Sequence, residues 1–122
     1  MPSKKPSVAK PPEGTVFFID RSLGVEPIRT SLVDAGLGVE IHDDHFDRDA
    51  DDRLWLRDVG ARGWVILTKD QRLRYRPLEL AALRASRASV FILVAGNLRG
   101  CEIAAVFVKA LPRIYKILAG VY

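Results

Sequence analysis

The sequence predicts an α/β fold in which a central, mainly parallel four-stranded sheet is flanked by helices. Four short apolar runs alternate with four segments of helical spacing along the 122 residues. The connections between them are short, and such alternation implies parallel strands joined by right-handed crossovers. The chain contains no internal repeat and no sign of a second domain. The strands are therefore expected to end at one shared edge of the sheet.

The four expected strands are short apolar runs rich in β-branched or aromatic residues. This is the pattern of strands that are buried on both faces. The third run is expected to be the most buried. The four runs are residues 16–19, 39–41, 64–67 and 90–94.

Each expected strand is followed by a segment in which apolar residues recur at helical spacing. Pro27 and Pro77 suit the first turns of the first and third helices. The second helix is expected to begin near residues 51–52. The last helix starts at about Cys101, and Pro112 is expected to kink it or divide it in two, because proline lacks the N–H that a helix needs.

The composition limits the class of protein. Residues 1–14, rich in Pro, Lys and Ser, predict a flexible basic arm ahead of one domain at 15–122. The arm lacks the apolar region of a secretory signal, and no apolar run approaches the ~20 residues needed to cross a membrane. Cys101 is the only cysteine, so no internal disulfide can form and a reducing cytoplasm is favoured. Its side chain is expected to be buried as a small apolar group.

The net charge of +4 conceals an uneven distribution of charge. Residues 34–58 contain nine acids and three bases, whereas the chain after Asp70 contains two acids and nine bases. An acidic centre beside a basic surface suits a metal site that handles a polyanion. Ordinary solubility charge would give the same composition.

Three aspartates stand where an expected strand ends or an expected helix begins. Asp20 follows the first strand, Asp52 opens the second helix, and Asp70 follows the third strand. Open α/β folds bind ligands at the carboxyl ends of their strands, so these carboxylates are expected to converge there. Converging carboxylates repel each other, and a divalent cation is the usual remedy. The alternative is that each aspartate only forms a turn or caps a helix.

Several polar residues near this edge are candidates for a supporting role. Asp51 competes with Asp52 for the middle position, although it can simply cap the helix. Thr68 can hydrogen-bond a ligand carboxylate or a metal-bound water. His42 and His45 are more naturally hydrogen-bond partners of neighbouring carboxylates than metal ligands. The supporting candidates are Asp43, Asp44, Asp51, Thr68 and Asn97.

Basic residues flank the candidate metal ligands and are expected to hold substrate phosphates. A solvated basic loop is the alternative. These residues are Arg21, Lys69, Arg72 and Arg74. The sequence has no P-loop, which argues against nucleotide hydrolysis, and no Gly-x-Gly-x-x-Gly motif, which argues against dinucleotide binding. It also has no Gly-x-Ser-x-Gly motif, which argues against covalent acyl chemistry.

Taken in order, these segments resemble the PIN-like nuclease domains, particularly the compact toxins of bacterial toxin–antitoxin pairs. The resemblance spans about 17–118. Its marks are Phe17-Phe-Ile-Asp-Arg-Ser-Leu-Gly24, His42-Asp-Asp-His-Phe46, Asp52-Arg-Leu-Trp55, Gly63-Trp-Val-Ile-Leu-Thr-Lys-Asp70, Gly96-Asn-Leu98 and Ala110-Leu-Pro-Arg-Ile114.

The resemblance implies a small three-layer sandwich that cleaves RNA with water activated by Mg²⁺ or Mn²⁺. It also implies Asp20, Asp52 and Asp70 as metal ligands and an antitoxin protein as partner, and it allows a homodimer. Larger PIN domains carry a fourth acidic residue late in the chain. The matching loop here offers Asn97, with Glu102 further on, which leaves a second metal ion open.

A rival hypothesis is a non-catalytic signalling module on a similar fold, such as a phosphoacceptor receiver domain. Receivers also place carboxylates, a Thr and a Lys around Mg²⁺. They prefer an acidic pair after the first strand, whereas the pair Asp43-Asp44 follows the second strand here.

Overall fold

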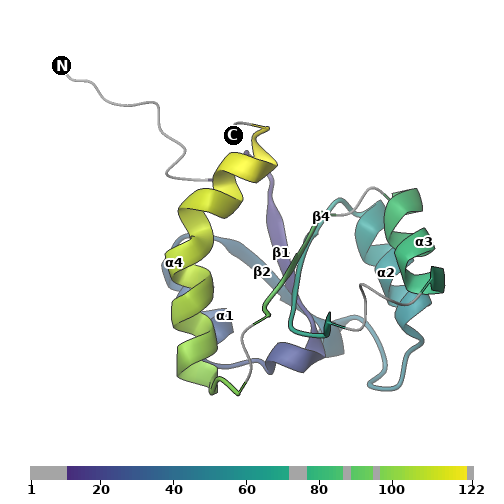
Figure 1. The fold of residues 1–122 in the computed structure, drawn as a ribbon, viewed down its shortest axis with the longest axis horizontal. Coiled ribbons are helices and arrows are strands. Elements are labelled where there is room, and N and C mark those ends of the chain that lie inside the picture. The colour runs from purple at the N-terminus through teal and green to yellow at the C-terminus, as the bar shows by residue number, and fades with distance from the viewer. Residues whose placement is uncertain (1–10, 72–76, 87–88, 95–96, 121–122) are drawn as a thin grey trace.

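The computed structural model describes residues 11–71, 77–86, 89–94 and 97–120. Within them, four strands alternate with four α-helices (Figure 1). The strands are β1 (Val16–Ile19), β2 (Gly38–Ile41), β3 (Val65–Thr68) and β4 (Ser89–Ile92). The helices are α1 (Ile28–Asp34), α2 (Asp52–Ala61), α3 (Pro77–Ser86) and α4 (Gly100–Leu118), and two 3₁₀ turns follow the first two strands, η1 (Arg21–Leu23) and η2 (His42–Asp44).

The sheet has the strand order β2-β1-β3-β4, and all neighbouring strands run parallel. In the centre, Phe18 of β1 lies opposite Glu40 of β2 and Ile66 of β3. The parallel sheet expected from the sequence is thereby confirmed. It follows that all four strands end at one edge, called the carboxyl edge below.

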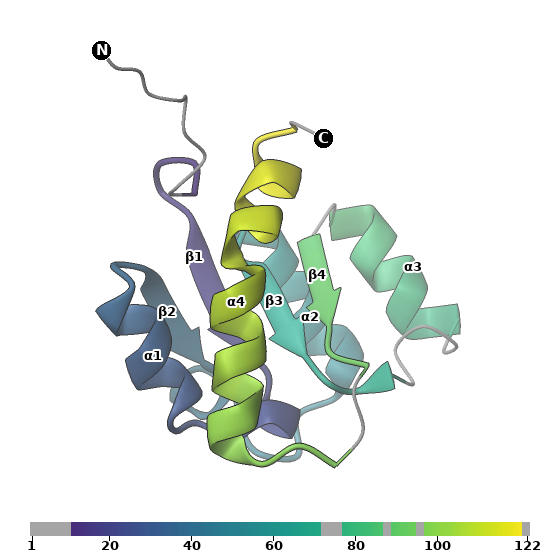
Figure 2. The same ribbon diagram turned by 60° about the vertical axis from the view of Figure 1, so that its left-hand side comes forward.

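The helices form layers on both faces of the sheet, as Figures 1 and 2 show, with α1 and α4 on one face and α2 and α3 on the other. The strand order explains this arrangement. The chain moves outward in one direction from β1 to β2 and in the opposite direction from β3 to β4, and right-handed crossovers then place α1 and α3 on opposite faces. The expected three-layer sandwich is confirmed. The direction reverses between β1 and β3, which makes their carboxyl ends the switch point where ligands bind in such folds.

The core has two parts, one on each face of the sheet. Alternate side chains of β1 serve both faces, because successive residues of a strand point in opposite directions. Phe17 and Ile19 pack with the α1 and α4 layer, and Phe18 packs with Trp55 and Leu56 of α2. The central strands are buried on both faces, which is why they read as continuous apolar runs.

For the last helix, the alternative that Pro112 divides it is wrong, and so is the expectation that Cys101 is buried, whereas the kink at Pro112 stays a prediction. The helix is continuous from Gly100 to Leu118 with Pro112 inside it, so the proline does not divide it. Leu111 and Ile114, on either side of the proline, are both buried and hold the helix against the sheet. Cys101 is exposed rather than buried. It lies two residues before the buried Ile103, about 200° away around the helix, and therefore faces outward.

The remaining expectations about chain organisation concern the ends and the membrane. Residues 1–10 of the expected arm lie outside the described residues, so the arm stays a prediction. Among the described residues, no helix is long and apolar enough to cross a membrane.

Candidate active site

Asp20 lies at the point where β1 leaves the sheet. Its backbone is still extended, and its N–H donates to the Leu67 carbonyl of β3 at 3.0 Å. The next residue begins the 3₁₀ turn η1. This extra backbone bond to the neighbouring strand fixes Asp20 at the switch point, and the side chain is only 8% exposed.

Two hydroxyl groups hold one oxygen of the Asp20 carboxylate. Thr68 Oγ1 donates to Asp20 Oδ2 at 2.6 Å, and Ser22 Oγ donates to the same oxygen at 2.8 Å. The two hydroxyl oxygens lie 3.1 Å apart. Thr68 is fully buried at the end of β3, so the contact joins the ends of the two central strands.

The backbone fixes the direction in which these hydroxyls donate. The N–H of Asp70 donates to Thr68 Oγ1 at 3.0 Å, and the N–H of Lys69 donates to Ser22 Oγ at 3.0 Å. Each hydroxyl has one proton to give, so both protons point at Asp20. Among the described residues, no donor reaches the other oxygen, Asp20 Oδ1, and no cation pairs with the carboxylate. One oxygen is thus held by the protein while the other remains available to a ligand.

Asp70 belongs to the same end of the sheet. It stands two residues beyond the end of β3 and is half-buried. Its backbone bond to Thr68 links it to the hydroxyl pair that holds Asp20. Asp20 and Asp70 therefore follow the two strands that form the switch point.

Asp51 and Asp52 have different roles at the start of α2. Asp51 is the N-cap, because its side chain accepts from the Arg53 N–H at 2.8 Å and also pairs with the Arg53 guanidinium at 2.9 Å. Hydrogen bonds from Arg53 lower the pKa of Asp51 to about 2. Asp52 lies in the first turn, where its Oδ1 accepts from Trp55 Nε1 at 2.9 Å. The capping role expected of Asp51 is thus confirmed, whereas the role of Asp52 as the middle metal ligand stays a prediction.

Of the three predicted ligands, Asp20 and Asp70 follow strands that end at the carboxyl edge, and Asp52 lies in the first turn of α2. Among the described residues, no three Asp, Glu, His or Cys side chains form a group that could hold a metal ion by themselves. The donor chemistry nevertheless fits Mg²⁺ or Mn²⁺. Mg²⁺ prefers oxygen ligands and is often bound through one or two carboxylates, with water and substrate phosphate completing its shell. Asp20 and Asp70 supply carboxylates of this kind.

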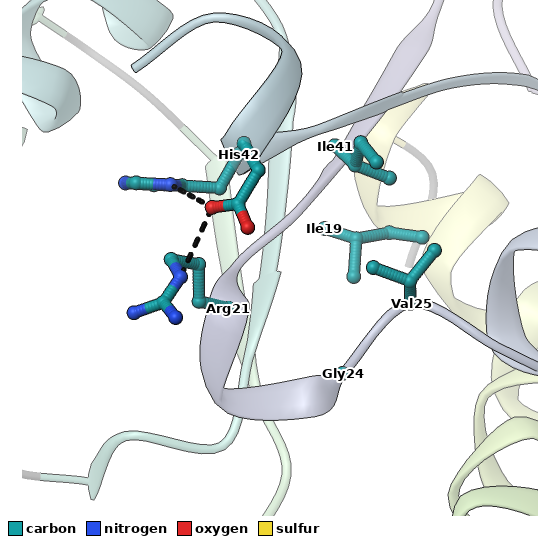
Figure 3. Close-up of a pocket in the computed structure, with 7 residues that line it drawn as sticks. Ile19, Arg21, Gly24, Val25, Ile41 and His42 are labelled. Carbon is teal, nitrogen blue, oxygen red and sulfur yellow. Dashed lines mark hydrogen bonds and ion pairs between the residues drawn. The ribbon is translucent and has the colours of Figure 1, made fainter. Parts of the chain in front are cut away.

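Asp43 links the first two strand ends (Figure 3). Its Oδ1 lies 3.0 Å from Arg21 Nε and 3.1 Å from His42 Nδ1. The hydrogen bond from His42, followed by the charge of Arg21, lowers the pKa of Asp43. His42 is only 3% exposed and packs against the rings of Phe18 and Trp55. The expectation that His42 serves a neighbouring carboxylate is borne out by these contacts.

The other candidates are distributed around the edge. Asp44 is exposed in η2, Asn97 is exposed between β4 and α4, and Lys69 is exposed after β3. Glu102 accepts from the Arg99 N–H at 2.8 Å and so caps α4. Arg72 and Arg74 lie outside the described residues.

Sequence reasoning missed Ser22, which holds Asp20 as directly as Thr68 does. A usable signal was present, because Asp and Ser side chains commonly hydrogen-bond groups two residues away. The spacing from Asp20 to Ser22 fits that pattern.

The fold and the carboxylate at its switch point define a doubly wound α/β domain with a ligand site at the carboxyl edge. Residues 15–95 match the family model described as "PIN like domain", and the chain belongs to this family. This confirms the family resemblance and disfavours the receiver-like alternative.

A curated relative carries the name "Putative ribonuclease VapC45" and comes from Mycobacterium tuberculosis (strain ATCC 25618 / H37Rv). It is 25% identical to this chain over 102 residues, an alignment that covers 80% of this chain and 74% of the relative. No solved structure is significantly similar to the chain.

Proposed function

We propose that this protein is a metal-dependent endoribonuclease and the toxin of a toxin–antitoxin pair. Membership of the PIN-like family and similarity to a relative named as a ribonuclease support this function. A cognate antitoxin protein would then be its partner. The chain has 19 Lys and Arg residues against 15 Asp and Glu residues, and this excess of positive charge suits a polyanionic substrate.

The observation that carries the proposal is the buried carboxylate of Asp20, which has no cationic partner among the described residues. Removing a carboxylate from water costs several kcal/mol in effect unless other groups compensate. Two hydroxyls offset part of this cost through Oδ2 alone. A divalent cation at Oδ1 would supply the missing positive charge at the switch point of the sheet.

Each of the surrounding residues would have a defined task. Asp20, Asp70 and Asp52 would hold Mg²⁺ or Mn²⁺, partly through water. Ser22 and Thr68 orient Asp20 so that Oδ1 faces the ligand. When bound, such a cation lowers the pKa of a bound water and neutralises charge on the leaving oxygen, so no side-chain nucleophile is needed. Lys69 at the same edge is available to a substrate phosphate.

Asp20→Asn tests the proposal, because it keeps the size of the side chain and removes the charge. Cleavage of single-stranded RNA in Mg²⁺ should fall by at least about 100-fold, in line with the several kcal/mol that a catalytic metal supplies. The fold should persist, as judged by circular dichroism. Asp34→Asn is the matched control, since Asp34 is an exposed aspartate in the last turn of α1. Undiminished cleavage by Asp20→Asn, or wild-type cleavage in EDTA, would overturn the proposal.

A further inference from the structure

A cavity of about 160 Å³ opens between η1 and the end of β2 (Figure 3). In this view the apolar side chains gather on one side of the cavity and the polar ones on the other. Ile19 and Arg21, which flank Asp20 in the chain, both line it. The apolar wall is Ile19, Val25 and Ile41, and the polar wall is Arg21, His42 and Asp43.

Among the described residues, the polar wall has one unoccupied acceptor and one unoccupied donor. Asp43 Oδ1 is occupied by Arg21 and His42, which fixes the orientation of the carboxylate. Among the described residues, no donor reaches Asp43 Oδ2. Arg21 uses Nε for Asp43 and Nη1 for the Arg48 carbonyl at 3.3 Å, and no described acceptor takes Nη2. The lowered pKa of Asp43 keeps it ionised near neutral pH, so it can only accept.

The size and chemistry of the cavity select a flat, single-ring ligand. An apolar cavity of about 150 Å³ is known to hold benzene. The present cavity is about as large and is partly open to solvent, so it suits one six-membered ring, and the second ring of a purine would project out of it. A pyrimidine edge has an adjacent donor and acceptor, namely N4–H and N3 in cytosine or N3–H and O4 in uracil. A carboxylate accepts from N4–H of cytosine or N3–H of uracil, and a guanidinium donates to N3 of cytosine or O4 of uracil.

We propose that this cavity is a subsite for a pyrimidine base of the RNA substrate. The proposal rests on the proposed function, because the base would belong to the nucleotide strand that is cut. Ile19 and Ile41 would contact the faces or edge of the ring, while Asp43 and Arg21 read its hydrogen-bonding edge. Because the cavity walls include both neighbours of Asp20, a base held there places its own sugar-phosphate within reach of the candidate metal site.

Binding of uncharged nucleosides to the full chain tests the subsite apart from catalysis. With EDTA present, cytidine, uridine, adenosine and guanosine are titrated while the methyl NMR signals of Ile19 and Ile41 are followed. The two pyrimidine nucleosides should shift both signals saturably and the purines should bind at least about fivefold more weakly. Asp43→Asn should weaken pyrimidine binding about tenfold, since a hydrogen bond to a charged group is lost. Asp47→Asn is the control, being an exposed nearby aspartate outside the cavity.

The outcomes separate the subsite from the proposed function. The subsite is supported if pyrimidine nucleosides bind, Asp43→Asn weakens that binding and Asp47→Asn leaves it intact. If the same protein then cleaves no RNA, only the proposed function fails. Absence of methyl shifts, equal binding of purines, or equal loss in the two variants overturns the subsite. RNA cleavage that depends on Asp20 would then leave the proposed function standing.

Discussion

At the scale of single residues, the backbone determines how Asp20 is presented. Two successive N–H groups, of Lys69 and Asp70, donate to the hydroxyls of Ser22 and Thr68, and both hydroxyls then donate to Asp20 Oδ2. Because the chain leaving β3 supplies these N–H groups, the direction in which the hydroxyls donate and the orientation of Asp20 follow from the pairing of β1 with β3. A carboxylate held in this way needs little reorganisation when a cation binds.

Thr68→Val tests how much this hydrogen-bond network contributes to stability and to RNA cleavage. Valine has the shape of threonine but cannot donate to the buried carboxylate or accept from the Asp70 N–H. Loss of a buried hydrogen bond to a charged group should lower the free energy of unfolding by about 2 kcal/mol. Urea denaturation measures this loss, and RNA cleavage should fall with it. Thr68→Ser, which keeps the hydroxyl, should retain most of the stability and most of the RNA cleavage. If the valine and serine variants behave alike, the Thr68 hydroxyl does not hold Asp20 in the way described.

At the scale of secondary-structure elements, the strands and their order were predictable because continuous apolar runs are required wherever a strand is covered on both faces. Residues 16–19 were assigned as found, and the other strands differ by one or two residues at their ends. The division of α4 at Pro112, one of the two predicted alternatives, does not occur, because buried neighbours outweigh the one hydrogen bond that a proline removes. The cap of α2 by Asp51 was foreseen from sequence, whereas which of Asp51 and Asp52 serves a metal could not be decided, since both are carboxylates at the start of the same helix.

The cap of α2 makes a prediction about pH. Asp51 has a pKa of about 2 in the folded protein, below the ordinary value of 3.8, so its contribution to stability is present above about pH 4 and is lost as the pH falls toward 2. Asp51→Asn keeps a capping oxygen but cannot ionise. The thermal midpoint of the wild type should exceed that of the variant at pH 7, and the difference should shrink below pH 4 and in high salt. A difference that does not change with pH would contradict the ion pair with Arg53.

At the scale of the whole molecule, part of the uneven charge seen in the sequence forms a basic surface on α4. Lys109, Arg113 and Lys116 recur at helical spacing on the exposed side of α4, and none of them pairs with an acid among the described residues. Arg29, Arg53 and Arg62 each pair with an acid instead. The sequence predicted the imbalance of charge and places these three bases at helical spacing, and the packing of α4 against the sheet shows that they lie on its exposed side.

The α4 cations are expected to contribute to binding of the RNA backbone. Lys109→Ala with Arg113→Ala should reduce the log–log slope of RNA affinity against salt by roughly 1.4, at about 0.7 per lost contact on a single strand. Fluorescence anisotropy in EDTA gives this slope without turnover. Arg57→Ala with Arg84→Ala removes equal charge from the opposite layer and should leave the slope nearly unchanged. Equal effects of the two double variants would mean that only net charge matters.

The central claim is that Asp20 anchors a divalent cation at the switch point of the sheet, and calorimetric titration of Mn²⁺ into the metal-free protein tests it most directly. The wild type and Asp34→Asn should bind Mn²⁺ with the same affinity, whereas Asp20→Asn should bind it at least about 100-fold more weakly, because loss of a ligand charge costs on the order of 3 kcal/mol. Equal Mn²⁺ affinity in the wild type and Asp20→Asn, or no binding to either, would contradict the account.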